Sequence, residues 1–138
     1  MDEAKKSAVQ SWLIKARHDL DSAVKLSQEP DPRLDTAIYH CQQTGEKSLK
    51  AFLVYHDQVI EKTHDLRLLV NLSEKLDKQF HDWIDKAALL TPYVAEYRYP
   101  GEYLEPDAEE FREALKVARE LHAFVLSLLP REVHPSQK

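Results

Sequence analysis

The residues best suited to bind a ligand lie between positions 93 and 107, where the sequence reads YVAEYRYPGEYLEPD. Four of the six tyrosines of the chain fall in this stretch, around a single arginine, Arg98. An arginine side chain can pair with a phosphate through two parallel hydrogen bonds, and tyrosine rings can stack on a nucleobase. The stretch therefore predicts a loop that binds a nucleotide or an RNA phosphate, with Arg98, Tyr99 and Tyr103 as candidate ligand-binding residues.

Structural roles are the alternative for the same stretch. Tyrosine side chains are common at subunit interfaces and at helix corners, so we expect Tyr93 and Tyr97 in the core or in an interface. Helix-breaking residues surround Arg98, which favours a polar cleft or an inter-subunit contact for its side chain. A buried ion pair between Arg98 and a bundle acid, such as Glu46 or Asp65, is the competing interpretation.

A second group of polar residues lies in the segment AIYHCQQTGEKSLKAFL, residues 37–53. In a helix, this spacing brings four polar side chains to one flank: His40, Gln43, Lys47 and Lys50. Glu46 stands four residues before Lys50, which is the spacing of a helical ion pair. One interpretation is therefore a solvated helix face, and the other is that Lys47 and Lys50 line an anion-binding groove.

Composition argues against several other classes of function. With a net charge of −5 the surface cannot be uniformly cationic, so any contact with nucleic acid needs a local basic patch. The seven histidines are scattered, with no HExxH spacing and no cysteine partner, so we expect no metal site and no cofactor. No apolar run approaches the roughly 20 residues that cross a bilayer, and the single cysteine fits a reducing compartment. We therefore expect a cytoplasmic protein with no membrane segment.

Apolar residues recur at helical spacing along the chain, and the chain contains only two glycines. The apolar stripes predict a first helix of about 25 residues, a second over 32–55, a broken third and a last one that Pro130 ends. Thr63 is the expected N-cap of the third helix. Gly45 lies inside the second stripe, which indicates close contact with a neighbouring helix.

Short connections between amphipathic helices make sequential helices antiparallel neighbours. The sequence therefore predicts a single all-α domain over residues 1–138. Its expected architecture is an antiparallel up-and-down bundle of four main helices, with a short or kinked extra helix. We expect a frayed tail from about residue 131, after the proline that ends the last helix.

Three segments in this order, HCQQTGEKSLKAFLVYH, KTHDLRLL and EYRYPG, resemble the prokaryotic HEPN domain. The leading segment WLIKARHDLDSAVKL is similar to the first helix of that family, so the resemblance spans roughly residues 7–130. It implies an antiparallel helical bundle that commonly forms a homodimer. It also implies a minimal nucleotidyltransferase as partner, in a toxin–antitoxin-like system.

Many HEPN proteins are ribonucleases that use an arginine followed, after four to six residues, by a histidine. Arg98 matches the arginine, but Tyr103, Leu104 and Glu105 stand at the three allowed histidine positions. The resemblance thus implies a ribonuclease motif without its histidine. We predict ligand binding rather than catalysis, and no catalytic residue.

Two further hypotheses stay open. A metal-independent ribonuclease could use Arg98 with another acid or base, although a tyrosine, with an ordinary pKa of roughly 10, is a poor base at neutral pH. His64 could serve only if the fold brings it to Arg98, and is otherwise a packing residue at a helix start. The third hypothesis is a purely structural dimerisation domain. The candidate ligand-binding residues are Arg98, Tyr99, Tyr103, His64, Lys47 and Lys50.

Overall fold

A computed structural model describes residues 1–100 and 104–136, and within these residues all regular structure is helical. The α-helices are α1 (Glu3–Leu26), α2 (Leu34–Tyr55), α3 (Leu66–Glu74), α4 (Ile84–Ala88) and α5 (Ala108–Ser127). Three 3-10 helices join or extend them: η1 (Lys78–Trp83), η2 (Thr91–Val94) and η3 (Arg131–Val133). The predicted all-α bundle is confirmed.

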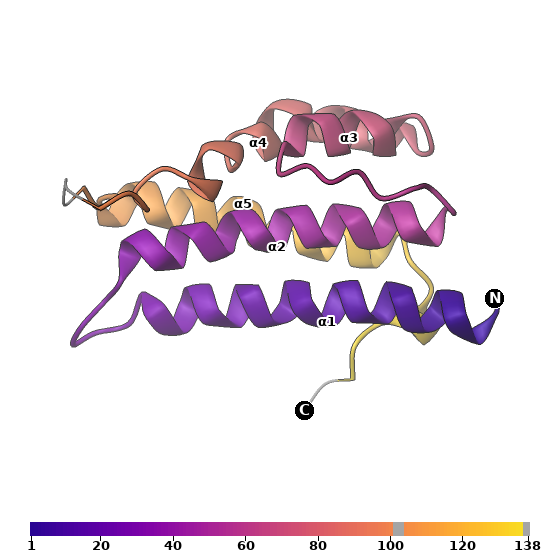
Figure 1. Ribbon diagram of the computed structural model, residues 1–138, viewed down its shortest axis with the longest axis horizontal. Coiled ribbons are helices and arrows are strands. Elements are labelled where there is room, and N and C mark those ends of the chain that lie inside the picture. Colours follow the sequence, from indigo (N-terminus) through magenta and orange to yellow (C-terminus); the bar gives the residue numbers. More distant parts are fainter. Residues whose placement is uncertain (101–103, 137–138) are drawn as a thin grey trace.

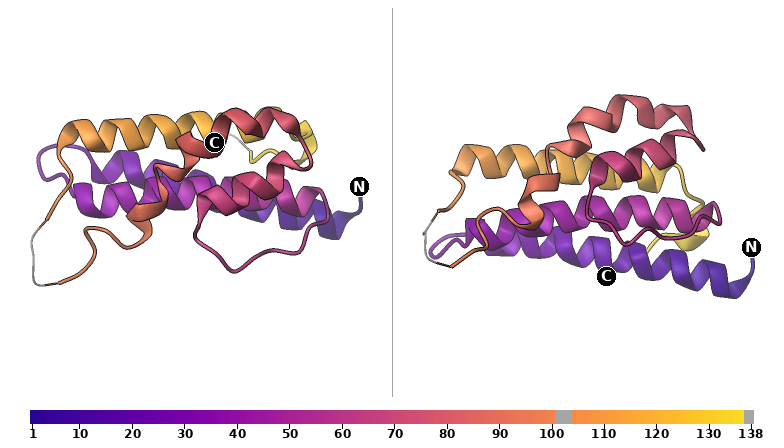
Figure 2. Two further views of the ribbon diagram at one scale, coloured as in Figure 1. Left: turned by 90° about the horizontal axis from the view of Figure 1, so that it is seen from above. Right: turned by 45° about the horizontal axis from the view of Figure 1, so that its top comes forward.

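The long helices α1, α2 and α5 lie side by side, with α1 antiparallel to α2 (Figure 1). The shorter helices α3 and α4 cover the side of α2 that faces away from α1. After α3 the chain turns back through η1, α4 and η2 to the end of the bundle where α5 begins (Figure 2). The chain thus reverses its direction at the break that was expected after the third apolar stripe. None of the described helices has the length and apolar character needed to cross a membrane.

At Gly45, three other segments lie close to α2. A Cβ atom on this residue would lie 3.1 Å from Leu66 Cδ1, 3.2 Å from Leu90 Cδ1 and 3.4 Å from Leu121 Cδ2. These contacts are tight, and they come from α3, from the residue before η2 and from α5. The close helix contact predicted from this glycine is confirmed.

The start of α3 differs from the prediction. Asp65, not Thr63, is the N-cap, and its Oδ1 accepts hydrogen bonds from the backbone N–H groups of Arg67 and Leu68. Thr63 Oγ1 instead accepts a hydrogen bond from the N–H of Asp65. A carboxylate is favoured at this position because it also interacts with the positive end of the helix dipole.

The segment after α5 also differs from the prediction. Val133 in η3 is completely buried, and His134 Nε2 lies 2.9 Å from the carbonyl oxygen of Leu126. A buried valine anchors this segment because exposing it to water would cost the free energy of an apolar side chain. Residues 131–134 therefore pack against the bundle, where the sequence predicted a frayed tail.

Candidate functional site

A cavity of about 750 Å³ opens at the end of the bundle where the start of α2 meets the segment after η2. Arg33, Tyr39 and His40 line it from one side, and Tyr97, Arg98 and Tyr99 line it from the other. Two carboxylates, Asp35 and Glu105, also border it, and Arg33 is paired with Asp31 at 3.0 Å. We call this cavity the Arg98 cleft.

Arg98 is exposed to solvent and lies over the ring of Tyr39, with its guanidinium carbon 3.8 Å from the ring centroid. Its Nη1 donates a hydrogen bond to the carbonyl oxygen of Val94 at 3.1 Å. The alternative of an ion pair with Glu46 or Asp65 does not occur in the described part of the chain. A guanidinium stacked on a ring keeps N–H donors at its edge, and these can face an anion.

The backbone immediately before Arg98 has an unusual conformation. Tyr97 has a φ of 70°, in the left-handed region that residues other than glycine rarely adopt. The hydroxyl groups of Tyr93 and Tyr97 both donate hydrogen bonds to the carboxylate of Glu110, at 2.6 Å and 3.0 Å. The two rings are stacked, with centroids 6.2 Å apart. Such strain persists only where the surroundings hold it, and here they fix the position of Arg98.

The two tyrosines of this corner have packing roles. Tyr93 is only 7% exposed and belongs to the core, while Tyr97 is half-buried against it. Burial and the hydrogen bond to Glu110 raise the pKa of Tyr97 to about 12. Both hydroxyl groups therefore stay protonated, as donors to a carboxylate. We expected this pair in the core or in an interface, and the two side chains lie in the core or against it.

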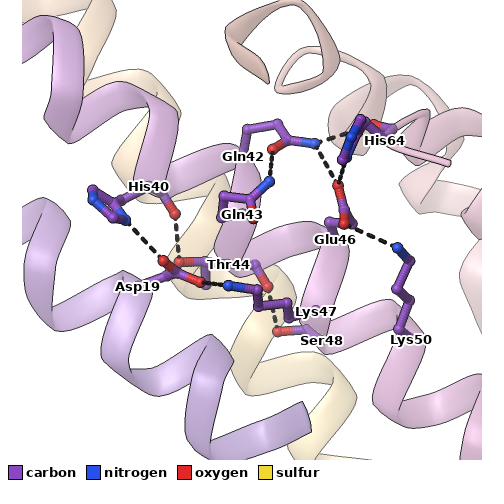
Figure 3. Close-up of polar contacts among 10 residues, drawn as sticks. All are labelled: Asp19, His40, Gln42, Gln43, Thr44, Glu46, Lys47, Ser48, Lys50 and His64. Carbon is purple, nitrogen blue, oxygen red and sulfur yellow. Dashed lines mark hydrogen bonds and ion pairs between the residues drawn. The ribbon is translucent and has the colours of Figure 1, made fainter. Parts of the chain in front are cut away.

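A polar network on the α1 side of α2 includes Lys47 (Figure 3). Asp19 of α1 lies 2.8 Å from His40 Nδ1 through one oxygen and 2.6 Å from Lys47 Nζ through the other. Asp19 is buried, so both contacts are shielded from water. Lys47 is thus held by an acid of the neighbouring helix and does not line the Arg98 cleft.

A second network surrounds Glu46, which is only 4% exposed. Its carboxylate lies 3.0 Å from Lys50 Nζ, 2.7 Å from His64 Nδ1 and 3.1 Å from Gln42 Nε2 (Figure 3). Burial alone would raise the pKa of Glu46, but the bonds to His64, Lys50 and Gln42 outweigh it and hold this pKa below its usual value. Lys50 is also buried, so the prediction of a solvated face is wrong here.

The sequence matches the HEPN domain family over residues 9–128. The chain belongs to the HEPN domain family. A search of curated proteins finds no match. The matched region runs from α1 to the end of α5, so the HEPN domain includes the Arg98 cleft and both polar networks.

Within this HEPN domain the candidate residues separate into different places. Arg98 and Tyr99 line one cleft, and the Tyr99 side chain is exposed at its edge. Lys47, Lys50 and His64 belong to the two networks instead, and the structure does not bring His64 to the cleft. Tyr103 lies outside the described residues.

Sequence reasoning missed two contributors to the HEPN domain cleft. Tyr39 supplies the ring beneath Arg98, and His40, next to it on α2, is oriented by Asp19. The helical spacing placed His40 on a polar flank but could not identify a partner from another helix. Among residues 1–100 and 104–136, no three His, Cys, Asp or Glu side chains gather in a way that could hold a metal ion.

Proposed function

We propose that this HEPN domain binds the phosphate of a nucleotide or of RNA in the Arg98 cleft. One observation carries the proposal: the exposed Arg98 guanidinium is stacked on Tyr39 and forms no ion pair among the described residues. An arginine held in this way is ready to bind an oxyanion with two N–H donors, and it need not first release a carboxylate.

The remainder of the cleft suits a nucleotide. Its volume of about 750 Å³ is in the range of small-molecule sites. Tyr99 is 76% exposed at the edge, where its ring could stack on a base. The two bordering carboxylates, Asp35 and Glu105, would repel a polyanion that lay across them. We therefore expect contact with one or two phosphates near Arg98, and not with a long stretch of backbone.

We also infer, from the family resemblance, that the domain forms a homodimer and acts with a minimal nucleotidyltransferase in a toxin–antitoxin-like system. Light scattering of the purified protein tests the dimer, and a molar mass equal to one chain would contradict it. Co-expression with a nucleotidyltransferase encoded beside it tests the partnership through copurification. A negative result in either test would not bear on ligand binding by the Arg98 cleft, which has its own test.

The test of ligand binding uses ATP and a short 2′-O-methyl RNA oligonucleotide, measured by calorimetry and fluorescence anisotropy. We expect Arg98→Ala to weaken binding by about tenfold or more, since hydrogen bonds to a charged group contribute roughly 1.5–3 kcal/mol. Arg67→Ala is the matched control, because it removes the same charge from an exposed pair with Asp85 on another face. Equal affinity of both variants, or no binding by the unaltered protein, would contradict the proposal.

A further inference from the structure

A groove between α1 and α5 carries two arginines and a buried histidine. It has a volume of about 340 Å³, and Arg17, Arg119 and His122 are among the residues that line it. We call it the α1–α5 groove. We propose that this groove is a second binding site, and that it takes a phosphate-type oxyanion, either a free ion or the phosphate group of a small ester. It shares no lining residue with the Arg98 cleft, so the two sites can be tested separately.

Two helices supply positive charge to the α1–α5 groove. Arg119 and His122 are three residues apart on α5, and side chains at this spacing are neighbours on one helix face. The pKa of His122 is lowered first by burial and then by the charge of Arg17, so this guanidinium from α1 lies near the imidazole. Arginine suits an oxyanion well, since two of its N–H groups can bond to two oxygens at once.

His122 contributes a buried polar atom that the chain leaves without a partner. The residue is only 6% exposed, and its Nε2 has no hydrogen-bond partner within residues 1–100 and 104–136. Buried polar atoms are hydrogen-bonded in the great majority of cases, so an unpaired one points to a contact from outside the chain. The two arginines beside it make an anion the ligand that this place favours.

One carboxylate, Asp21, also lines the α1–α5 groove. It lies 3.6 Å from Arg17 Nε, and both side chains are partly exposed. An exposed pair at this distance is weak, and it engages Nε alone, so the Nη groups of Arg17 can still donate to a ligand. Arg119 forms no ion pair within the part of the chain that the structure describes. The lining therefore carries a net positive charge even while His122 is neutral.

Anion binding in the α1–α5 groove should be coupled to protonation of His122. Burial and Arg17 favour the neutral ring, and an anion beside the ring would favour the imidazolium instead. By reciprocity, a proton on His122 strengthens anion binding by the same factor. Affinity should therefore rise as the pH falls toward the lowered pKa, by at most about tenfold per pH unit. The other charged or titratable groups near the ring are Asp21, Arg119 and His134.

The experiment follows the imidazole nitrogens of His122 by NMR, in the unaltered protein and in Arg98→Ala. The spectrum of His122→Gln identifies the signal of this residue among the seven histidines. Sodium sulfate is compared with sodium chloride at equal ionic strength, because sulfate keeps its double charge through mildly acidic pH. We expect sulfate, and not chloride, to shift the His122 signal to saturation in both proteins. Saturating sulfate should also raise the pKa of His122.

Calorimetry with sulfate tests the side chains of the α1–α5 groove. Arg17→Gln and Arg119→Gln should each weaken binding by about tenfold or more, since each removes hydrogen bonds to a charged ligand. Arg112→Gln is the matched control, because it removes an exposed arginine of α5 that does not line the groove. It should bind sulfate as the unaltered protein does. His122→Gln should remove the rise in affinity at acidic pH.

Inorganic phosphate and glycerol phosphate, titrated near neutral pH, distinguish the two sources of the oxyanion. Tighter binding of inorganic phosphate indicates a free ion, tighter binding of glycerol phosphate indicates an ester, and both results support the site. The proposal is overturned if sulfate leaves the His122 signal unchanged or shifts it without saturation. Equal affinities of Arg119→Gln and Arg112→Gln for sulfate also overturn it. Loss of the sulfate effect in Arg98→Ala would assign the anion to the Arg98 cleft and would overturn the second site.

Discussion

The guanidinium of Arg98 lies over the ring of Tyr39, with 3.8 Å between the guanidinium carbon and the ring centroid. This contact joins the corner that leads toward α5 to the beginning of α2, two segments far apart in the sequence. Two separate contacts therefore fix the position of Arg98. Tyr97 fixes its backbone through the hydrogen bond to Glu110, and Tyr39 supports its side chain.

The platform beneath Arg98 can be tested without touching the arginine. Tyr39→Leu should weaken phosphate binding by about two- to fivefold, because a cation–π contact at an exposed site contributes about 0.5–1 kcal/mol. Tyr39→Phe keeps the ring and should bind ATP as the unaltered protein does. Calorimetry with ATP measures both. If the Leu and Phe variants bind equally well, the ring does not support the arginine.

The acceptor of the two tyrosine hydroxyls should contribute to stability. Glu110→Ala leaves the hydroxyl of the buried Tyr93 without its acceptor, and a lost partner of this kind costs about 1–3 kcal/mol in the free energy of unfolding. Glu109→Ala is the matched control, since it removes the same charge from the same first turn of α5 at an exposed position. Urea denaturation of the two variants should separate them, and equal losses would show that the tyrosine contacts are unimportant.

The buried pair of Glu46 and Lys50 should be costly to break. Glu46→Ala leaves the Lys50 ammonium buried without its counter-ion, and such a change typically lowers the free energy of unfolding by about 3–5 kcal/mol. The comparison is Asp85→Ala, which breaks an exposed pair with Arg67 and should cost no more than about 1 kcal/mol. Thermal denaturation followed by circular dichroism compares the stability losses of the two variants. Equal losses would contradict the prediction and would mean that water reaches Lys50 freely.

His122 should make the stability depend on pH. Its pKa is lowered, first by burial and then by the charge of Arg17, and its Nε2 has no hydrogen-bond partner in the described structure. The folded state therefore favours the neutral ring, whereas the unfolded chain takes up a proton as the pH falls through about 6.5. Stability should fall as the pH drops below that value, until the pH reaches the lower pKa of the folded state.

The measurement is urea denaturation between neutral and mildly acidic pH. One titrating group contributes at most about 1.4 kcal/mol per pH unit in this window. The pKa of His56 is also lowered, chiefly by burial, so both histidines contribute to the change of unfolding free energy with pH. His122→Gln should therefore reduce the slope without abolishing it. An unchanged slope would show that His122 is protonated in the folded protein too.

The fold could be predicted because its signals are local. Apolar residues at helical spacing, Pro130 after the last helix and Gly45 within an apolar stripe each depend on neighbours in the sequence. The helix-breaking residues around Arg98 favoured a polar cleft or an inter-subunit contact for its side chain, and that side chain lines the Arg98 cleft. The N-cap of α3 was misplaced by two residues, because Thr63 and Asp65 are both good capping residues and sequence alone does not choose between them.

The partners of the polar side chains could not be predicted in the same way. Asp19 and His40 come from different helices, and their contact depends on how α1 and α2 are aligned along their axes. The same holds for His64 and Glu46, which meet across the connection between α2 and α3. An ion pair within one helix, Glu46 with Lys50, was anticipated, but its burial depends on the tertiary packing around it.

The missing side chain at Gly45 determines how far along its axis α2 can sit. A shift of one residue moves a helix by about 1.5 Å and turns it by about 100°, which would bring a larger side chain, Thr44 or Glu46, toward the space that three leucines close upon. Gly45 therefore favours the observed axial register of α2 over the registers one residue away. That register sets the height of Tyr39 and His40 opposite Arg98, so a residue outside the cleft lining governs the alignment of the cleft.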